Sequence, residues 1–154
     1  MTAHRGSVRH DLQLACPPDT VWALVGDPGR VHEWFTGIVS CTVEGDLRTI
    51  VTRSGLPMPE HLLTVDPVLR RLQYRITAPM FTEHLGTIDV HELSDGTSLV
   101  VYSTDAEPAP LALVIGGAAR AALANLPVVL GLDGSGPPGG GGPGSQSAEP
   151  KGAP

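Results

Sequence analysis

The sequence predicts an α+β domain in which a curved antiparallel sheet of about seven strands packs against one long C-terminal helix. Residues 108–127 read PAPLALVIGGAARAALANLP, which has the length and apolar content of a single helix with Arg120 as its one charge. Most of the chain before it consists of short alternating segments joined by turns, as is typical of antiparallel strands. Such a helix needs apolar cover, and a sheet can supply it.

The N-terminal part predicts one strand and two short helices. Residues 7–15 alternate and form the expected first strand. A helix then begins at Pro17–Pro18 and stops at Gly26. A second short helix begins at Asp27–Pro28, where an N-cap acceptor precedes a proline. This second helix carries Val31, Trp34 and Phe35.

Strand signals dominate after Gly37. Asp95–Gly96 is the strongest turn signal in the chain and predicts the last hairpin. The short connections make consecutive strands antiparallel neighbours. The expected strands cover residues 38–43, 47–53, 60–65, 72–77, 82–93 and 97–106.

The terminal helix shows an apolar repeat close to the helical period, and Pro127 is expected to end it. Its middle is rich in glycine and alanine, which either lets another backbone approach closely or leaves room for a ligand. The paired glycines also leave open whether the helix is broken. The expected buried stripe is Leu111, Val114, Ile115, Ala118, Ala122 and Leu126, and the small residues are Gly116, Gly117, Ala118, Ala119, Ala121 and Ala122.

The chain predicts one folded domain followed by a tail. With 154 residues, of which 41% are hydrophobic, a single core is expected over residues 1–130. Residues 131–154 contain nine glycines and five prolines and no large apolar residue after Leu132. Such a segment buries too little surface to order itself, so we expect a disordered tail.

Composition excludes several classes of partner. The net charge of −6, without a basic stripe, argues against nucleic acid. Arg120 and Asn125 within the apolar run, together with Pro127, argue against a membrane span. The polar N-terminus lacks the apolar core of a signal peptide, so we expect a cytoplasmic protein with Cys16 and Cys41 reduced.

The sequence also lacks the common catalytic and cofactor motifs. No glycine-rich loop follows a strand and opens a helix, and nothing resembles a nucleophile elbow. The six histidines have no paired spacing and the cysteines no CxxC partner. We therefore expect neither a metal nor a cofactor.

An ordered series of short motifs over residues 7–130 resembles the SRPBCC superfamily, in its small bacterial single-domain type. That superfamily includes START domains, the birch-pollen allergen and the polyketide cyclase/dehydrase-like proteins. The resemblance implies a helix-grip fold, with a cavity between the sheet and the long helix. One departure is that relatives often have Tyr at the position of His84 and Trp at that of Tyr102. The series comprises Pro18–Asp19–Thr20–Val21–Trp22, Asp27–Pro28 with Trp34, Val43–Glu44–Gly45, residues 60–66 (EHLLTVD), Gly96–Thr97, Tyr102, Glu107–Pro108 and Ala124–Asn125–Leu126.

Strand alternation predicts which side chains face this cavity. On the strand at 82–93, Thr87, Asp89 and His91 should face solvent. The inward face of the strand at 60–65 is ambiguous, because the apolar residues Leu62 and Leu63 lie on opposite faces. The expected inward sets are Leu72, Tyr74 and Ile76, then His84, Gly86, Ile88 and Val90, then Val100, Tyr102, Thr104 and Ala106.

An apolar cavity with a few polar tips is the usual constitution of a small-molecule site. The resemblance implies that Trp34 and Phe35 lie at the mouth, and Met80 with Phe81 is expected on a rim loop. Each candidate also has a plain structural explanation as a core or surface residue. The candidate ligand-binding residues are Trp34, Phe35, Tyr74, Met80, Phe81, His84, Ile88, Val100, Tyr102, Ile115, Ala118 and Ala122.

Three functions remain open at this point, and the first is favoured. The protein binds or carries a hydrophobic small molecule such as a lipid, polyketide or isoprenoid. Alternatively, it is a polyketide cyclase/dehydratase-type enzyme that uses His84, Glu60 and Tyr102 as acid/base groups. The third is a regulatory module in which the tail or the convex face binds a protein partner. The sequence does not decide between monomer and dimer.

Overall fold

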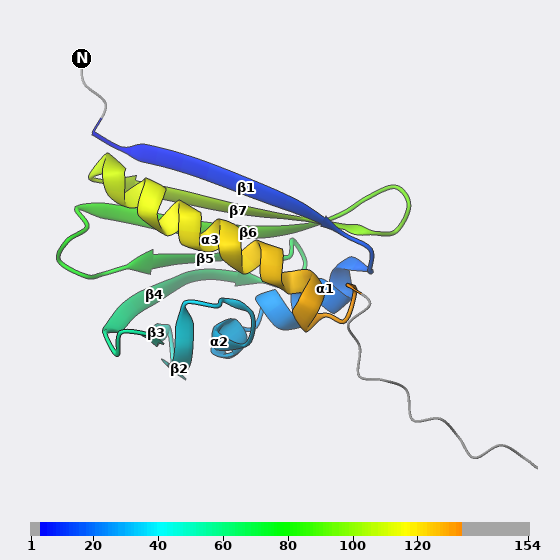
Figure 1. The fold of residues 1–154 in the computed structure, drawn as a ribbon, viewed down its shortest axis with the longest axis horizontal. Coiled ribbons are helices and arrows are strands. Elements are labelled where there is room, and N and C mark those ends of the chain that lie inside the picture. The colour runs from blue at the N-terminus through cyan, green and yellow to red at the C-terminus, as the bar shows by residue number, and fades with distance from the viewer. Residues whose placement is uncertain (1–3, 134–154) are drawn as a thin grey trace, which may run out of the picture.

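The computed structural model describes residues 4–133 and confirms the predicted fold class: a curved seven-stranded antiparallel sheet with one long C-terminal helix (Figure 1). Residues 134–154, most of the predicted tail, lie outside the described part of the chain. The elements are β1 (Gly6–Leu14), α1 (Pro18–Val25), the 3-10 turn η1 (Pro28–Arg30), α2 (Val31–Trp34), β2 (Ile38–Glu44), β3 (Leu47–Thr52), β4 (Pro57–Asp66), β5 (Arg71–Ile76), β6 (Glu83–Glu92), β7 (Ser98–Glu107) and α3 (Ala109–Val129).

The sheet order is β1-β7-β6-β5-β4-β3-β2, with every neighbouring pair antiparallel. Strands β2 to β7 therefore follow one another as a meander, and β1 closes the far edge beside β7. The predicted turn between β6 and β7 has Gly96 at φ 82°, and the Asp95 carboxylate accepts a hydrogen bond of 3.0 Å from the Thr97 amide. This left-handed backbone angle explains why glycine stands there.

The helices after β1 begin where the sequence indicates. The Asp27 carboxylate accepts a 2.9 Å hydrogen bond from the Gly29 amide and caps η1, with Pro28 as its first residue. The chain then passes directly into the single turn of α2. α2 packs on α3 and β2, so it closes one end of the space between sheet and helix.

The inward faces of β5, β6 and β7 are those predicted, since all the expected inward residues are buried. Thr87 was expected at the solvent but is only 8% exposed. Its hydroxyl accepts a 3.2 Å hydrogen bond from Gln73, whose amide oxygen accepts one of 3.0 Å from Thr64. This polar ladder on the outer face covers Thr87. On β4 the sequence left open whether Leu62 or Leu63 faces inward. The pairing of β4 with β5 shifts register between Leu62 and Thr64, and Leu63 is the exposed one.

Helix α3 is turned relative to the prediction. Val114, expected in the buried stripe, is 66% exposed, and Ala118 is also exposed. The helix instead lays its smallest residues on β1 and β7. A Cβ atom on Gly116 would lie 2.8 Å from Val8 Cγ1, so this glycine permits the close contact with β1. The residues that are buried are Ala112, Gly116, Ala119, Ala122, Leu123 and Leu126.

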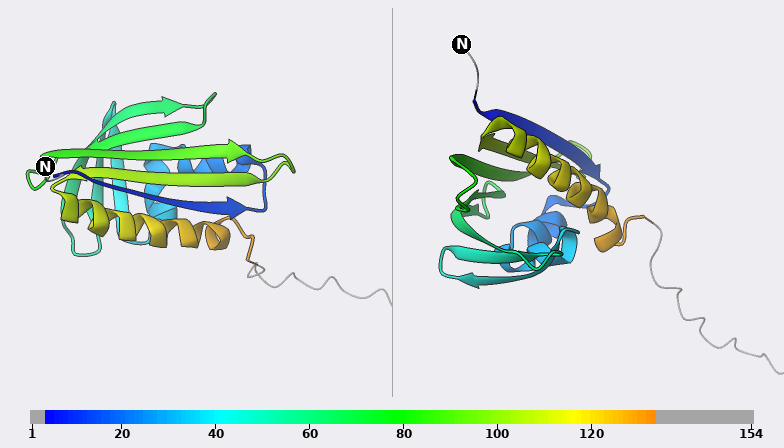
Figure 2. Two further views of the ribbon diagram at one scale, coloured as in Figure 1. Left: turned by 90° about the horizontal axis from the view of Figure 1, so that it is seen from above. Right: turned by 60° about the vertical axis from the view of Figure 1, so that its left-hand side comes forward.

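The helix is also longer than predicted. It runs without interruption through Gly116–Gly117 and past Pro127 to Val129. Pro127 removes one amide donor, and the next turn restores the ladder with a 2.9 Å hydrogen bond from the Leu130 amide to the Leu126 carbonyl. By length and composition α3 is the one described helix that could cross a membrane. Here one face of it packs along β1 and β7 (Figures 1 and 2), while Leu113, Val114 and Val128 remain exposed.

The contact between α3 and β1 can be tested by placing a methyl group on either of the two adjacent glycines. Both Gly116→Ala and Gly117→Ala gain about 1 kcal/mol in helix propensity. Only the former forces a new atom against Val8, because a Cβ on Gly117 meets nothing within 4 Å. We expect Gly116→Ala to be less stable than Gly117→Ala by about 1–3 kcal/mol in urea unfolding. Equal stability of the two variants would contradict the close contact.

Candidate ligand-binding site

A cavity of about 140 Å³ lies between α3 and the half of the sheet that the helix does not cover. It arises because α3 sits over β1 and β7 while β2, β3 and β4 curve around the opposite side (Figure 2). α2 and the segment after it supply one wall. The lining residues are Val31, Phe35, Gly37, Ile38, Arg48, Ile50, Thr52, Met58, Glu60, Tyr74, Ile76, Tyr102, Ile115 and Ala118.

Exposure divides the lining into a mouth and a floor. The residues that are exposed or half-exposed mark the mouth, namely Phe35, Gly37, Thr52, Met58, Ile115 and Ala118. The others are buried and form the floor and walls. The walls are apolar, whereas all the charged and phenolic groups of the lining belong to the buried set. A ligand would therefore place its polar part innermost.

Arg48 and Glu60 form an ion pair at this floor. They stand directly opposite each other on β3 and β4, each 3% exposed, and Arg48 Nε donates to Glu60 Oε2 at 2.6 Å. Arg48 Nη1 donates to the Pro28 carbonyl at 3.3 Å. The guanidinium carbon also lies 4.9 Å from the centre of the Tyr74 ring, in cation–π contact. Burial raises the pKa of Glu60, and the charge of Arg48 opposes that rise.

Two tyrosines complete the polar floor. The hydroxyls of Tyr74 on β5 and Tyr102 on β7 are hydrogen-bonded to each other across the intervening β6. The ring of Tyr74 can lie over β6 because Gly86 is its register partner, and a Cβ there would lie 2.4 Å from the ring atoms. Burial raises the pKa of Tyr102 to about 12 and that of Tyr74 well above 10.0. Both phenols therefore stay protonated at neutral pH.

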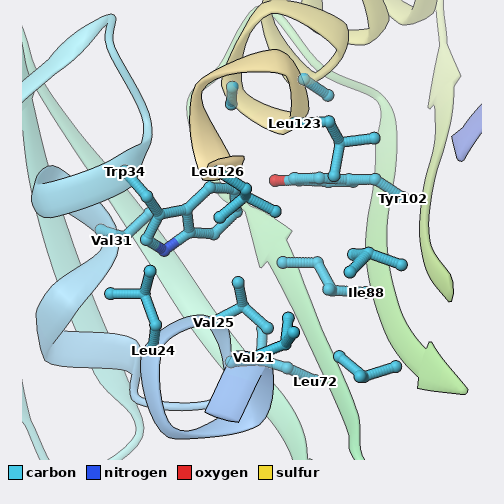
Figure 3. Packing of buried hydrophobic residues seen from close by; sticks show 14 of the residues in the cluster. Val21, Leu24, Val25, Val31, Trp34, Leu72, Ile88, Tyr102, Leu123 and Leu126 are labelled. Carbon is cyan, nitrogen blue, oxygen red and sulfur yellow. The ribbon is translucent and has the colours of Figure 1, made fainter. Parts of the chain in front are cut away.

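Only part of the predicted site lies at this cavity. Phe35, Tyr74, Tyr102, Ile115 and Ala118 line it, as does Glu60 from the acid/base set. Trp34 is 1% exposed and belongs to the core, where its ring centre lies 5.8 Å from that of Phe35 and 6.2 Å from that of Tyr102. Figure 3 shows Trp34 beside Leu126. Met80 lies exposed in the loop after β5. The predicted residues outside the lining are Trp34, Met80, Phe81, His84, Ile88, Val100 and Ala122.

Sequence reasoning missed Arg48, the counterpart of Glu60. A signal was present, because residues 48 and 60 are equidistant from Ser54 and Ser54–Gly55 is a turn dipeptide. A hairpin centred there places the two side chains opposite each other and on the same face. It also places Ile50 and Met58, two further lining residues, in the same register.

His84 lies behind the floor and does not line the cavity. It is completely buried, with its ring centre 5.5 Å from Tyr74 and 5.3 Å from Phe81. Its Nδ1 accepts a 3.0 Å hydrogen bond from the Ile76 amide, so the proton of the neutral ring is on Nε2. Burial lowers the pKa of His84 from 6.5 to about 4, against a smaller opposing effect of Asp105. At neutral pH it is therefore an uncharged core residue.

No group of three potential metal ligands occurs within residues 4–133. Both cysteines are free, with Cys16 buried and Cys41 partly buried. Cys41 Sγ donates to the Gly29 carbonyl at 3.0 Å and lies 3.5 Å from His32 Nδ1. Because its thiol proton is donated to the Gly29 carbonyl, Cys41 links β2 to η1.

The buried His84 should make the folded state acid-sensitive. Between pH 6.5 and about 4 the unfolded chain protonates this imidazole and the folded protein does not, so stability falls as pH drops through that window. The shift corresponds to about 2–3 kcal/mol at pH 4.5. In His84→Gln, urea midpoints should fall less between pH 7 and pH 4.5 than in the parent. The exposed His91→Gln variant should behave like the parent, and an unchanged slope in His84→Gln would contradict a neutral buried His84.

Several solved structures share the fold of this chain. XoxI from Bacillus cereus superposes with a TM-score of 0.77 at 25% identity, over 83% of this chain and 96% of that one. A putative uncharacterized protein from Bacillus thuringiensis gives 0.75 at 24% identity, over 81% and 98%. A solution structure from Thermobifida fusca gives 0.68 at 26%, over 82% and 95%. Comparison with the curated proteins finds no match.

The family comparison covers nearly the whole described chain. The model of a family described as polyketide cyclase / dehydrase and lipid transport matches residues 5–131. That range includes every strand, α3 and the complete lining of the cavity. The chain therefore belongs to the polyketide cyclase/dehydrase and lipid transport family and is an SRPBCC-type domain.

Proposed function

We propose that this protein binds a hydrophobic small molecule, of lipid, polyketide or isoprenoid type, in the cavity between α3 and strands β3 to β5. The observation that carries the proposal is the cavity itself, with apolar walls leading to a buried polar floor. That combination is typical of small-molecule sites, in which apolar contacts supply affinity and a few polar groups fix orientation. Membership of a family that includes lipid transport proteins supports the same conclusion.

The volume limits what the floor can hold. At about 140 Å³ the cavity is similar in size to engineered apolar cavities of about 150 Å³ that bind benzene. One ring or a short branched chain therefore fills the enclosed part. A longer ligand extends through the mouth past Phe35, Met58 and Ile115. Methionine at such a position adapts to different shapes.

A cyclase/dehydratase-type enzyme is the second candidate, because Glu60 and Tyr102 both reach the cavity. Its third proposed residue, His84, lies outside the lining with Nδ1 occupied by the Ile76 amide. Both phenols have raised pKa values and stay protonated, so neither is a base at neutral pH, and the one carboxylate of the floor, Glu60, is paired with Arg48. Binding without turnover therefore fits the floor better than acid/base chemistry does.

Toluene tests the binding proposal because its size matches the enclosed part of the cavity. Titration of the isotopically labelled protein, followed by NMR chemical shifts, should show saturable binding with the largest shifts at Ile50, Ile115 and their neighbours. Ala118→Phe, which places a ring at the mouth, should weaken toluene binding at least about tenfold.

Ala121→Phe is the matched control, because Ala121 is exposed on α3 and does not line the cavity. It should bind toluene as the parent does. Saturable shifts that both variants retain equally would place the bound toluene elsewhere and contradict the proposed site. An absence of saturable binding in the parent would contradict the proposal altogether.

A further inference from the structure

The floor of the cavity carries two opposite charges that cancel. Among residues 4–133, Arg48 and Glu60 are the only charged ones in the lining, and both are deeply buried. The other titratable groups that face the cavity are Tyr74 and Tyr102, which stay neutral. The wall formed by α2, the segment after it and α3 adds no titratable group. The site is therefore polar at its floor but has no net charge.

The hydrogen-bonding capacity of the floor is only partly used. Arg48 donates through Nε to Glu60 and through Nη1 to the Pro28 carbonyl, and no described residue accepts a hydrogen bond from its Nη2. Glu60 accepts through Oε2, and no described residue donates to its Oε1. The hydrogen bond between the two tyrosine hydroxyls uses one of their two protons, so the other hydroxyl proton is available for a ligand. Donors and an acceptor thus remain side by side at the floor.

From this arrangement we propose that the site selects ligands with a neutral hydroxyl, phenol or enol head and rejects those with a carboxylate of the same size. A hydroxyl can accept a hydrogen bond from Arg48 and donate one to Glu60 at the same time. This inference names the ligand class of the cavity and so rests on the proposed function.

The preference follows from the cost of burying charge. A lone arginine at the bottom of an apolar cavity would attract a carboxylate through paired charge-assisted hydrogen bonds. Here Glu60 already neutralises Arg48 at 2.6 Å, so a second carboxylate would bring an uncompensated negative charge beside it. Such an anion binds only if a proton enters with it, on the ligand or on Glu60. A neutral hydroxyl needs no such proton.

Three ligands of similar size separate the contributions of the hydroxyl, the carboxylate and the apolar ring to binding: p-cresol has a neutral hydroxyl, benzoate has a carboxylate, and toluene has neither. At pH 7.5, NMR titration of the full chain should show p-cresol binding at least about tenfold more tightly than benzoate, and more tightly than toluene. Benzoate binding as tightly as p-cresol would overturn the inference. Failure of all three to bind would instead overturn the proposed function.

Glu60→Gln leaves Arg48 unbalanced, so it should shift the ratio of benzoate to p-cresol affinity toward benzoate by at least about tenfold. Glu92→Gln, the same change at an exposed position on β6, should leave the ratio unchanged. A folded Glu60→Gln protein with the parental ratio would overturn the inference.

The parent protein provides a second test in case Glu60→Gln does not fold. If benzoate enters with a proton, its apparent affinity should rise as pH falls from 8 to 6, approaching tenfold per pH unit, while that of p-cresol stays constant. Calorimetry in buffers of different ionisation enthalpy should then show uptake of one proton with benzoate and none with p-cresol. Binding of benzoate that is independent of pH and takes up no proton would overturn the inference.

Discussion

The close contact of α3 with β1 is the constraint on which the cavity depends. Gly116 meets Val8, and Gly6 has no room for a side chain against Ala109 and Ala112, so helix and strand approach until their backbones nearly touch. That contact draws the helix to one side of the sheet, over β1 and β7. The sheet continues past it through five further strands, which curve around a space that the helix does not fill. The small residues of the helix thus create room for a ligand indirectly, next to the helix face that packs on β1, where Ile115 and Ala118 line the cavity.

The floor of that space is not explained by folding stability. Burying an arginine and a glutamate costs several kcal/mol of desolvation for each ion, and their mutual attraction offsets this only partly, so apolar residues of similar volume are often as stable. Arg48 and Glu60 nevertheless occupy adjacent strands with a 2.6 Å hydrogen bond, and Tyr74 lies against the guanidinium. The proposed recognition of a hydroxyl head gives a reason for this cost, because it would use the donor and the acceptor that the ion pair leaves unoccupied.

The sequence was sufficient for the inward faces of β5, β6 and β7, since alternation with period two fixes them, as at Leu72, Tyr74 and Ile76. The sequence was not sufficient to predict which face of α3 is buried. That helix is apolar on nearly all sides, so periodicity could not choose between Val114 and Gly116, and close packing of small residues decided. The ion pair was missed because it depends on strand register, which two residues on separate strands do not reveal until the turn at Ser54–Gly55 is placed. His84 was assigned to the cavity from strand alternation and Trp34 from the family resemblance. Their depth behind Tyr74 and Phe35 is a property of the assembled core.

The central claim, that the cavity binds an apolar molecule with its polar head at the buried floor, can be tested by locating a bound ligand directly. Intermolecular nuclear Overhauser effects between p-cresol and the labelled protein report which protons lie within about 5 Å of the ligand. The account predicts contacts from the ligand to the side chains of Ile50, Ile76 and Ile115, with the hydroxyl end nearest Arg48, Glu60 and the Tyr74 ring. Contacts confined to exposed apolar residues such as Leu113, Val114 or Val128 on the outer face of α3 would contradict it.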